Sequence, residues 1–278
     1  MRHYLFCLLM ALPLCFTACS SDDNDSTENK GKKYLAEITV KEHQWKFGER
    51  SEYGDLYERY TYNEKNLLIK FETNYYLSVA QSRIPEYTLY TYDERNRIVE
   101  KNEYELSLLQ YKYRYQYNEF DSVSVMKKYS KDGSLNETHT YEYDTNHRLI
   151  KDTEIVNYVR SDYGYIHTYT YSGNKVTEVI TMFEDGSPFG TYVREYDSHK
   201  NLISSSYTSA RDGKTSISKY EYEYDSKGRI VKSTSPYSIL YKRYKEYTYN
   251  DDGTINKIHL SYSDRNDQSD LIYTYTWK

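Results

Sequence analysis

The sequence predicts an all-β protein, built as an antiparallel up-and-down meander of about nine hairpin repeats. A unit of Tyr-x-Tyr, an Asp or Asn, a few polar residues and an aliphatic pair recurs about every 26 residues. Tyr alternates with polar residues before each turn, which is the period of a β-strand. Residues that tolerate positive φ recur at one turn position, which indicates hairpins. The copies are Tyr60–Ile69, Tyr90–Val99, Tyr115–Val123, Tyr141–Ile150, Tyr169–Val176, Tyr222–Val231 and Tyr247–Ile255, with a degenerate copy at Arg194–Ile203 and a half-unit at Tyr273–Tyr275.

The clearest copy begins at Tyr220, where Tyr and Glu alternate strictly up to Tyr224. This alternation predicts a strand with Tyr on one face and charge on the other. The sequence from Asp225 to Gly228 fits a type I turn followed by a left-handed glycine. If Asp225 pairs with Arg229, Tyr224 faces Ile230 and Glu223 faces Val231.

The same turn position is occupied in other copies by residues that accept positive φ at low cost. These residues are Asn66, Asn96, Asp121 and Gly253, whereas His147 and Lys200 fit less well. The shorter loop Ser172–Lys175 predicts a two-residue turn.

Each copy supplies two strands, so we expect roughly 16–18 strands in total. An open sheet of this size would expose both edges, whereas closure removes them. We therefore expect a porin-like soluble barrel or a flattened sandwich. Charged residues make up 28% of the chain and the mean hydropathy is −0.94, which argues against the apolar outer band of a membrane-spanning barrel.

The first 18 residues read as a secretory leader, because Tyr4–Phe16 is apolar but too short to cross a bilayer. The segment Phe16–Cys19 resembles the lipobox of bacterial lipoproteins, although Phe16 departs from the usual Leu. The resemblance implies cleavage before Cys19, lipidation of Cys19 and attachment to a membrane. The alternative is an ordinary secretory signal cleaved near Ala18. Residues 19–33 are then a flexible acidic and polar linker, and residues 34–278 form a single β-repeat domain.

The acidic run Ser20–Asp25 resembles the export signal of Bacteroidetes surface lipoproteins. This resemblance implies an outer-membrane protein that is lipid-anchored and exposed at the cell surface. A periplasm-facing anchor, with the run acting as a solvated spacer, is the alternative.

Three units, Tyr90–Ile98, Tyr141–Leu149 and Tyr222–Ile230, resemble the YD or RHS repeats that wind Tyr-Asp hairpins into β-shells. The resemblance covers residues 57–278. The chain is more similar still to small Tyr-rich lipoproteins of Bacteroidetes, a group of unknown function with a porin-like fold. That likeness implies a barrel without implying transport, and it assigns no functional residue.

All three cysteines, Cys7, Cys15 and Cys19, lie in the first 19 residues, which leaves the β domain without a disulfide or a thiol nucleophile. The histidines fall on different repeats without metal-ligand spacing, so we expect no metal and no cofactor. The acidic loop Asp264–Asp270 lacks the Gly and terminal Glu of an EF-hand, which favours a solvated hairpin tip. With no phosphate cradle or nucleophile elbow, we expect a protein that is not an enzyme. The net charge of −5 argues against a nucleic-acid partner.

The 38 tyrosines either fill a pleated sheet or stack on sugars and protein partners. A ligand site is more expected where the repeat breaks down, at Tyr75–Pro85, Tyr158–Tyr165 and Phe183–Tyr192. The candidate binding residues are Trp45, Phe189 and Trp277, and the two tryptophans are expected to meet if the barrel closes. The favoured function is binding of a glycan or another extracellular polymer. The alternative is a structural or protein-interaction shell of the cell envelope without a small ligand.

Overall fold

A computed structural model describes residues 34–278, except residues 47–48, 51–55, 78–81, 158–161, 237–240 and 264. These residues form one unit, Tyr34–Lys278, and the described part contains strands and turns but no helix. No described segment is a helix long and apolar enough to cross a membrane. Cys19 and the acidic run lie outside the described residues.

Twenty strands follow one another along this unit. They are β1 (Leu35–Lys46), β2 (Glu49–Arg50), β3 (Leu56–Tyr62), β4 (Leu68–Leu77), β5 (Ser82–Tyr92), β6 (Ile98–Glu105), β7 (Leu108–Tyr117), β8 (Val123–Ser130), β9 (Leu135–Tyr143), β10 (Leu149–Asn157), β11 (Asp162–Ser172), β12 (Lys175–Met182), β13 (Pro188–Tyr196), β14 (Leu202–Ser209), β15 (Thr215–Lys219), β16 (Glu221–Tyr224), β17 (Ile230–Pro236), β18 (Lys242–Tyr249), β19 (Ile255–Tyr262) and β20 (Arg265–Trp277).

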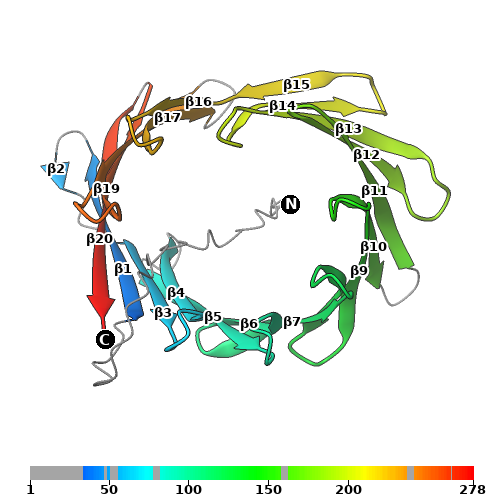
Figure 1. Ribbon diagram of the computed structural model, residues 1–278, viewed down its shortest axis with the longest axis horizontal. Helices are drawn as coiled ribbons and strands as arrows, with labels where there is room; N and C mark the ends of the chain where they lie inside the picture. Colours follow the sequence, from blue (N-terminus) through cyan, green and yellow to red (C-terminus); the bar gives the residue numbers. More distant parts are fainter. Residues whose placement is uncertain are drawn as a thin grey trace, which may run out of the picture. The chain divides into compact units, whose positions relative to one another are not determined.

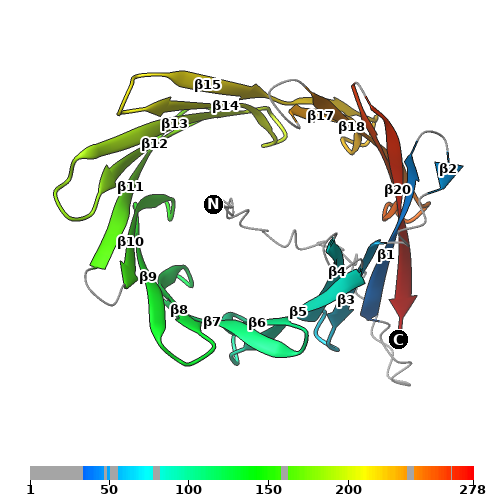
Figure 2. The same cartoon turned by 180° about the vertical axis from the view of Figure 1, so that it is seen from behind.

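The strands form an antiparallel meander that returns to its start (Figures 1 and 2). The closing seam joins β1 to β20, from Leu35 opposite Trp277 to Trp45 opposite Gln268, while the other edge of β1 pairs with β3. The expected all-β meander and its barrel-like closure are confirmed. The strand count also agrees, because β2 has only two residues and β15 and β16 are two halves of one strand separated by Tyr220.

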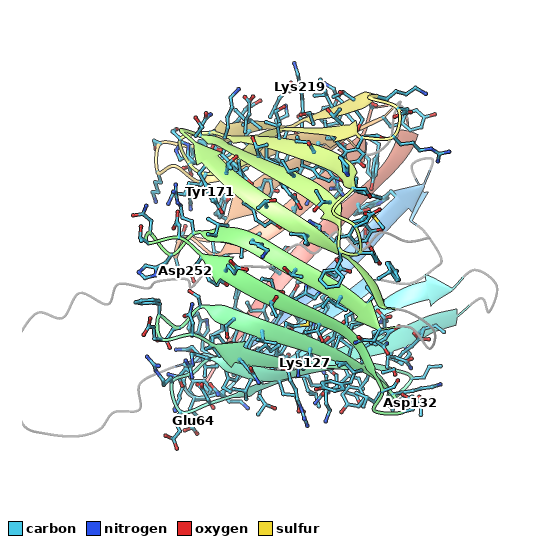
Figure 3. All side chains as sticks on the ribbon, turned by 90° about the vertical axis from the view of Figure 1, so that its right-hand side faces the viewer. Glu64, Lys127, Asp132, Tyr171, Lys219 and Asp252 are labelled. Atoms are coloured by element: carbon cyan, nitrogen blue, oxygen red, sulfur yellow. The ribbon has the colours of Figure 1, made fainter. Side chains whose placement is uncertain are left out.

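The predicted turn is present in the Tyr-Asp hairpins. In the clearest copy, the Asp225 N–H donates to the Arg229 carbonyl at 2.9 Å, and the Gly228 N–H donates to the Asp225 carbonyl at 3.0 Å. The left-handed position is confirmed even where its residue fits poorly, since φ is +59° at His147 and +67° at Lys200. The Tyr-Asp turns gather at one end of the wall, marked by Glu64 and Asp252 in Figure 3, and the remaining turns gather at the other end, marked by Asp132.

One predicted register is wrong. Tyr224 does face Ile230, but Glu223 faces Lys232 rather than Val231, because a bulge leaves Val231 as an extra residue. The same register shift lies immediately before Tyr62, Tyr92, Tyr117 and Tyr249. A bulge of this kind bends the strand and increases its twist, which suits a closed wall.

The tyrosine-bearing face is the inner face of the wall. Lys219, which belongs to the opposite face, points away from the ring in Figure 3. Side chains converge on the concave side of a curved sheet, so Tyr90, Tyr115 and Tyr141 are half-buried, whereas the outward Gln116 and Glu142 are exposed.

The wall is a single sheet without a second layer packed against it. The buried hydrophobic residues of the described part are few and scattered around the ring: Leu35, Ala36, Val40, Tyr113, Met126, Ile180, Ile258 and Leu260. Barrels of 16 or more strands are too wide for side chains to fill, so the inner face lines a hydrated interior.

Candidate functional site

Six tyrosines of the Tyr-Asp units tie a hairpin to the one before it. The Tyr117 hydroxyl donates to the Ile98 carbonyl at 2.7 Å, and the Tyr143 hydroxyl donates to the Val123 carbonyl at 2.7 Å. Tyr92, Tyr171, Tyr249 and Tyr275 make the equivalent bond. Each bond satisfies a carbonyl at or beside the bulge, where the strand ladder is interrupted.

The Asp and Arg of the unit complete this junction. The Asp93 carboxylate accepts bonds from the N–H groups of Arg95 and Arg97 at 2.9 Å each, which holds the turn. The Arg97 guanidinium contacts Asp93 and the next turn's Asp121 at 2.6 Å each, and it lies 4.5 Å over the Tyr117 ring. Arg148 and Arg229 cover Tyr171 and Tyr249 in the same way. The Tyr-Asp motif is therefore structural, and functional chemistry has to be sought elsewhere.

A band of ionisable side chains crosses the inner face beyond the Tyr-Asp end of the wall, on strands β6 to β13. We call it the ion-pair belt. Its residues are Lys101, Glu103, Lys128, Glu137, His139, Asp152, Glu154, His167, Glu178 and Arg194. Strand register places them together, since Lys128 faces Glu137, Glu154 faces His139, and Asp152 faces His167.

Direct contacts link the members of the belt in pairs. Lys101 Nζ lies 2.8 Å from Glu103, and Lys128 Nζ lies 2.9 Å from Glu137. Between these pairs stands buried Tyr113, whose hydroxyl donates to Glu103 at 3.0 Å while the Lys101 ammonium lies 4.0 Å from its ring centre.

The second half of the belt is centred on two imidazoles. His139 Nδ1 lies 3.0 Å from Asp152. His167 Nδ1 lies 2.7 Å from Glu178, whose other oxygen accepts a 2.6 Å bond from Arg194. His167 Nε2 lies 3.8 Å from Glu154, so one imidazole joins two carboxylates.

These contacts set the protonation of the belt. Burial lowers the pKa of His167, but Glu154 and Glu178 overcome this effect and raise the pKa to about 9. The pKa of His139 is also raised: burial lowers it, but the contact with Asp152 outweighs this effect. The pKa of Glu154 is lowered, mainly by His167. With both imidazoles protonated, the five cations of the belt face its five carboxylates.

A second feature is an open groove of ≈ 510 Å³ between the first two Tyr-Asp turns. Its lining residues are Asn63, Glu64, Lys65, Leu67, Ile69, Tyr90, Thr91, Tyr92, Asp93 and Asn96. Leu67 stands where three other units have Arg97, Arg148 and Arg229, so no guanidinium from this position covers Tyr92. Asn63 and Asn96 stand where Asp93 and Asp121 hold Arg97, which gives this groove amide groups rather than a carboxylate pair.

The predicted binding residues are not brought together. Trp45 and Trp277 both lie on the β1–β20 pair, but at opposite ends of it, so the expectation that they meet is wrong. Phe189 is 42% exposed on β13 and contacts the Tyr165 ring at 5.0 Å. The described residues contain no group of three or more His, Cys, Asp or Glu suited to a metal ion.

The ion-pair belt was missed by sequence reasoning, which placed charge on the outer face alone. Its signal was present, because His139 and His167 stand two places before Tyr141 and Tyr169 and therefore share their face. The error came from generalising the copy at Tyr220–Tyr224, where every inner position is Tyr.

Comparisons with known proteins give only distant likenesses. No family model and no curated protein matches the chain. A porin-like protein from Bacteroides uniformis is 12% identical, with a TM-score of 0.48 over 87% of this chain and 98% of that one. A TcdB2-TccC3 structure without its hypervariable C-terminal region is 14% identical, with a TM-score of 0.38 over 77% of this chain and 12% of that one. A chain of the Photorhabdus luminescens Tc holotoxin pore is 12% identical, with a TM-score of 0.36 over 76% of this chain and 13% of that one. These TM-scores are too low to carry a functional argument, so the function is argued from the chain's own residues.

Proposed function

We propose that this chain is a non-enzymatic, lipid-anchored protein of the outer cell surface that binds a glycan or another extracellular polymer. The observation that carries the proposal is the composition of the inner wall. Half-buried tyrosine rings alternate there with paired charges and face a hydrated interior rather than a packed core. Aromatic rings that stack on sugar faces, beside fixed hydrogen-bonding groups, are suited to a polar polymer.

The charges of the belt support binding rather than catalysis. A glycoside hydrolase needs one carboxyl group with a raised pKa to act as the acid. In the belt, Glu154 and Glu178 have lowered pKa values because His167 and Arg194 stabilise their charged forms. Carboxylates neutralised in this way are positioned to accept hydrogen bonds from hydroxyl groups.

Intrinsic fluorescence of the full chain in detergent, titrated with a panel of soluble polysaccharides, tests the binding proposal. We expect a saturable change with one glycan class. A Tyr111→Leu variant on the inner wall should weaken that response, and Tyr129→Leu on the outer face of β8 serves as its matched control. A flat response across the panel would contradict the proposal.

The anchor and its orientation need a separate test. We expect Cys19→Ser to release the protein from membranes, and an antibody against the β domain to label intact cells. Labelling only after the outer membrane is permeabilised would favour the periplasm-facing alternative.

The alternative function, a protein-interaction shell, is supported by apolar side chains on the outer face. Ile217 is 64% exposed on β15, and Val179 and Ile272 are also exposed on outward positions. Cross-linking of intact cells followed by mass spectrometry distinguishes the two. An Ile217→Asp variant that loses one envelope partner while keeping glycan binding would show that the outer face acts independently.

A further inference from the structure

Two cations stand next to each other on the inner face of β18. Arg243 and Lys245 are two residues apart and share the face of Tyr247, which lies opposite buried Ile258. Side chains at this spacing are separated by about 7 Å along a strand, which lets two long side chains converge on one ligand group. We call Arg243 and Lys245 the basic pair.

The basic pair has no carboxylate partner in the described part of the chain. Neither side chain forms a hydrogen bond or ion pair there, and the buried Nε of Arg243 has no acceptor. This contrasts with the ion-pair belt across the ring, where Lys128 is paired with Glu137 and Arg194 with Glu178.

The surroundings of the basic pair are hydroxyl groups and apolar side chains. Arg243 lies between Ser235 and Tyr262, and Lys245 lies between Ser233 and Leu260. The next strand continues this surface with buried Ser269 opposite Leu260. Hydroxyl groups donate hydrogen bonds to an anion, but they do not neutralise a cation.

This arrangement is costly for the protein alone. Removing a cation from water without a partner is unfavourable, and like charges side by side add to the cost. Burial and the neighbouring Arg243 both lower the pKa of Lys245. An uncompensated cost of this kind is typical of positions that serve a ligand rather than the fold.

We propose that the basic pair binds an anionic substituent, a carboxylate or a sulfate, on an acidic glycan held against the inner wall. This inference rests on the proposed function and narrows it to acidic polymers. The planar guanidinium of Arg243 offers a fork of N–H groups that matches either oxyanion, and Lys245 adds a point charge. Ser233 and Ser235 supply hydroxyl groups beside the same oxygens.

The test uses the full chain in detergent, with oligogalacturonate for carboxylate, a chondroitin sulfate oligosaccharide for sulfate, and dextran as a neutral glycan. In the double variant Arg243→Gln/Lys245→Gln, we expect the affinity for one acidic oligosaccharide to fall at least about tenfold. The dependence of this affinity on salt concentration should also be weaker in the double variant than in the wild type. The matched control is Lys219→Gln, on the outer face in Figure 3, which should bind like the wild type.

Failure of this inference is distinguishable from failure of the proposed function. Acidic oligosaccharide bound equally by the wild type and the double variant would overturn the basic pair but keep glycan binding. If the wild type and the double variant both bound dextran, with no preference for an acidic ligand, the basic pair would likewise be overturned and glycan binding kept. Absence of any glycan binding would overturn both proposals.

A stability measurement separates a ligand site from a structural role. Without ligand, Lys245→Met should have a melting temperature equal to or above that of the wild type, because it removes a half-buried charge that has no carboxylate partner among the described residues. A clear fall in melting temperature would show that Lys245 stabilises the fold, and it would contradict the inference.

Discussion

The carbonyl of Ile98 illustrates how a tyrosine completes the wall at the scale of single residues. The strand register shifts at this point, and the hydroxyl of Tyr117 donates to the carbonyl from the next hairpin at 2.7 Å. The cation of Arg97 covers the same ring. Tyr117, through its ring and hydroxyl, and Arg97, through its guanidinium, thus join two consecutive repeats.

Removing that hydroxyl should weaken the fold without altering the shape of the side chain. We expect Tyr117→Phe to lower the free energy of unfolding by about 1 kcal/mol, because the Ile98 carbonyl loses its donor. Urea denaturation followed by circular dichroism measures the change. Tyr129→Phe is the control, since the Tyr129 hydroxyl makes no hydrogen bond within the described residues. Equal losses in both variants would contradict the assigned role.

The turn at Lys200 carries strain that glycine would relieve. Its φ is +67°, the same left-handed region that Gly228 adopts at +76°. We expect Lys200→Gly to raise the free energy of unfolding by about 0.5–1 kcal/mol, because the Cβ clash disappears. The reciprocal Gly228→Lys should lower it by a similar amount. Changes of the same sign in the two variants would refute this explanation.

Sequence reasoning located these left-handed positions because most copies of the repeat place Asn, Asp or Gly there. The repeat then assigns the same position to His147 and Lys200, whose residue types alone would not indicate it. It did not locate the bulge that moves Glu223 from Val231 to Lys232. A bulge is decided by hydrogen bonds across two strands, and the aliphatic pair around it looks like ordinary strand sequence.

At the scale of strands, the ion-pair belt depends on register. His139, Asp152, His167 and Glu178 are far apart in the sequence, yet each lies on a strand beside the next. Alternation predicts which residues share a face, and the meander predicts which strands are neighbours. Side-chain contacts such as Glu178 with both His167 and Arg194 depend on rotamers, which no local pattern encodes.

The belt gives the protein a defined response to alkaline pH. The pKa of His167 is about 9 in the folded state, above the ordinary value of 6.5 that applies when the chain is unfolded. A raised pKa stabilises the fold fully below pH 6.5, and this contribution is lost as the pH rises through 9. We expect NMR titration of the imidazole to give this raised value.

The protonation of His167 should also make the free energy of unfolding depend on pH. The difference in unfolding free energy between the wild type and His167→Gln should be largest near pH 6 and should shrink by pH 9.5. His147→Gln, at a turn and without an ion pair among the described residues, is the control for loss of an imidazole outside the belt. A difference that stays constant from pH 6 to 9.5 would argue against the protonated belt.

At the scale of the whole β unit, stability comes from strand pairing around a ring rather than from one packed core. Closure depends on β1, which lacks a Tyr-Asp unit, and on β20, which carries the half-unit ending at Tyr275. Tyr275 continues the junction pattern, since its hydroxyl donates to the Ile255 carbonyl at 2.9 Å. The repeat predicts the meander, but pairing of the first strand with the last is non-local. Sequence reasoning therefore left barrel and flattened sandwich open.

The closing seam can be tested by a covalent link. Thr39 and Thr274 are paired directly across β1 and β20 on the outer face, at a separation that suits a disulfide. In a chain whose three native cysteines are replaced by Ser, we expect Thr39→Cys/Thr274→Cys to cross-link within one molecule under mild oxidation. The bond closes a loop of about 235 residues and should stabilise the fold by about 2–4 kcal/mol.

The matched control moves one cysteine to the far wall. Thr39→Cys/Thr170→Cys places one cysteine on β1 and the other on β11. These strands lie on opposite sides of the ring in Figure 1, so no internal disulfide should form. Non-reducing electrophoresis and mass spectrometry distinguish the internal link from dimers. An open sheet would keep β1 and β20 at distant edges, and the seam pair would then remain reduced or form dimers like the control.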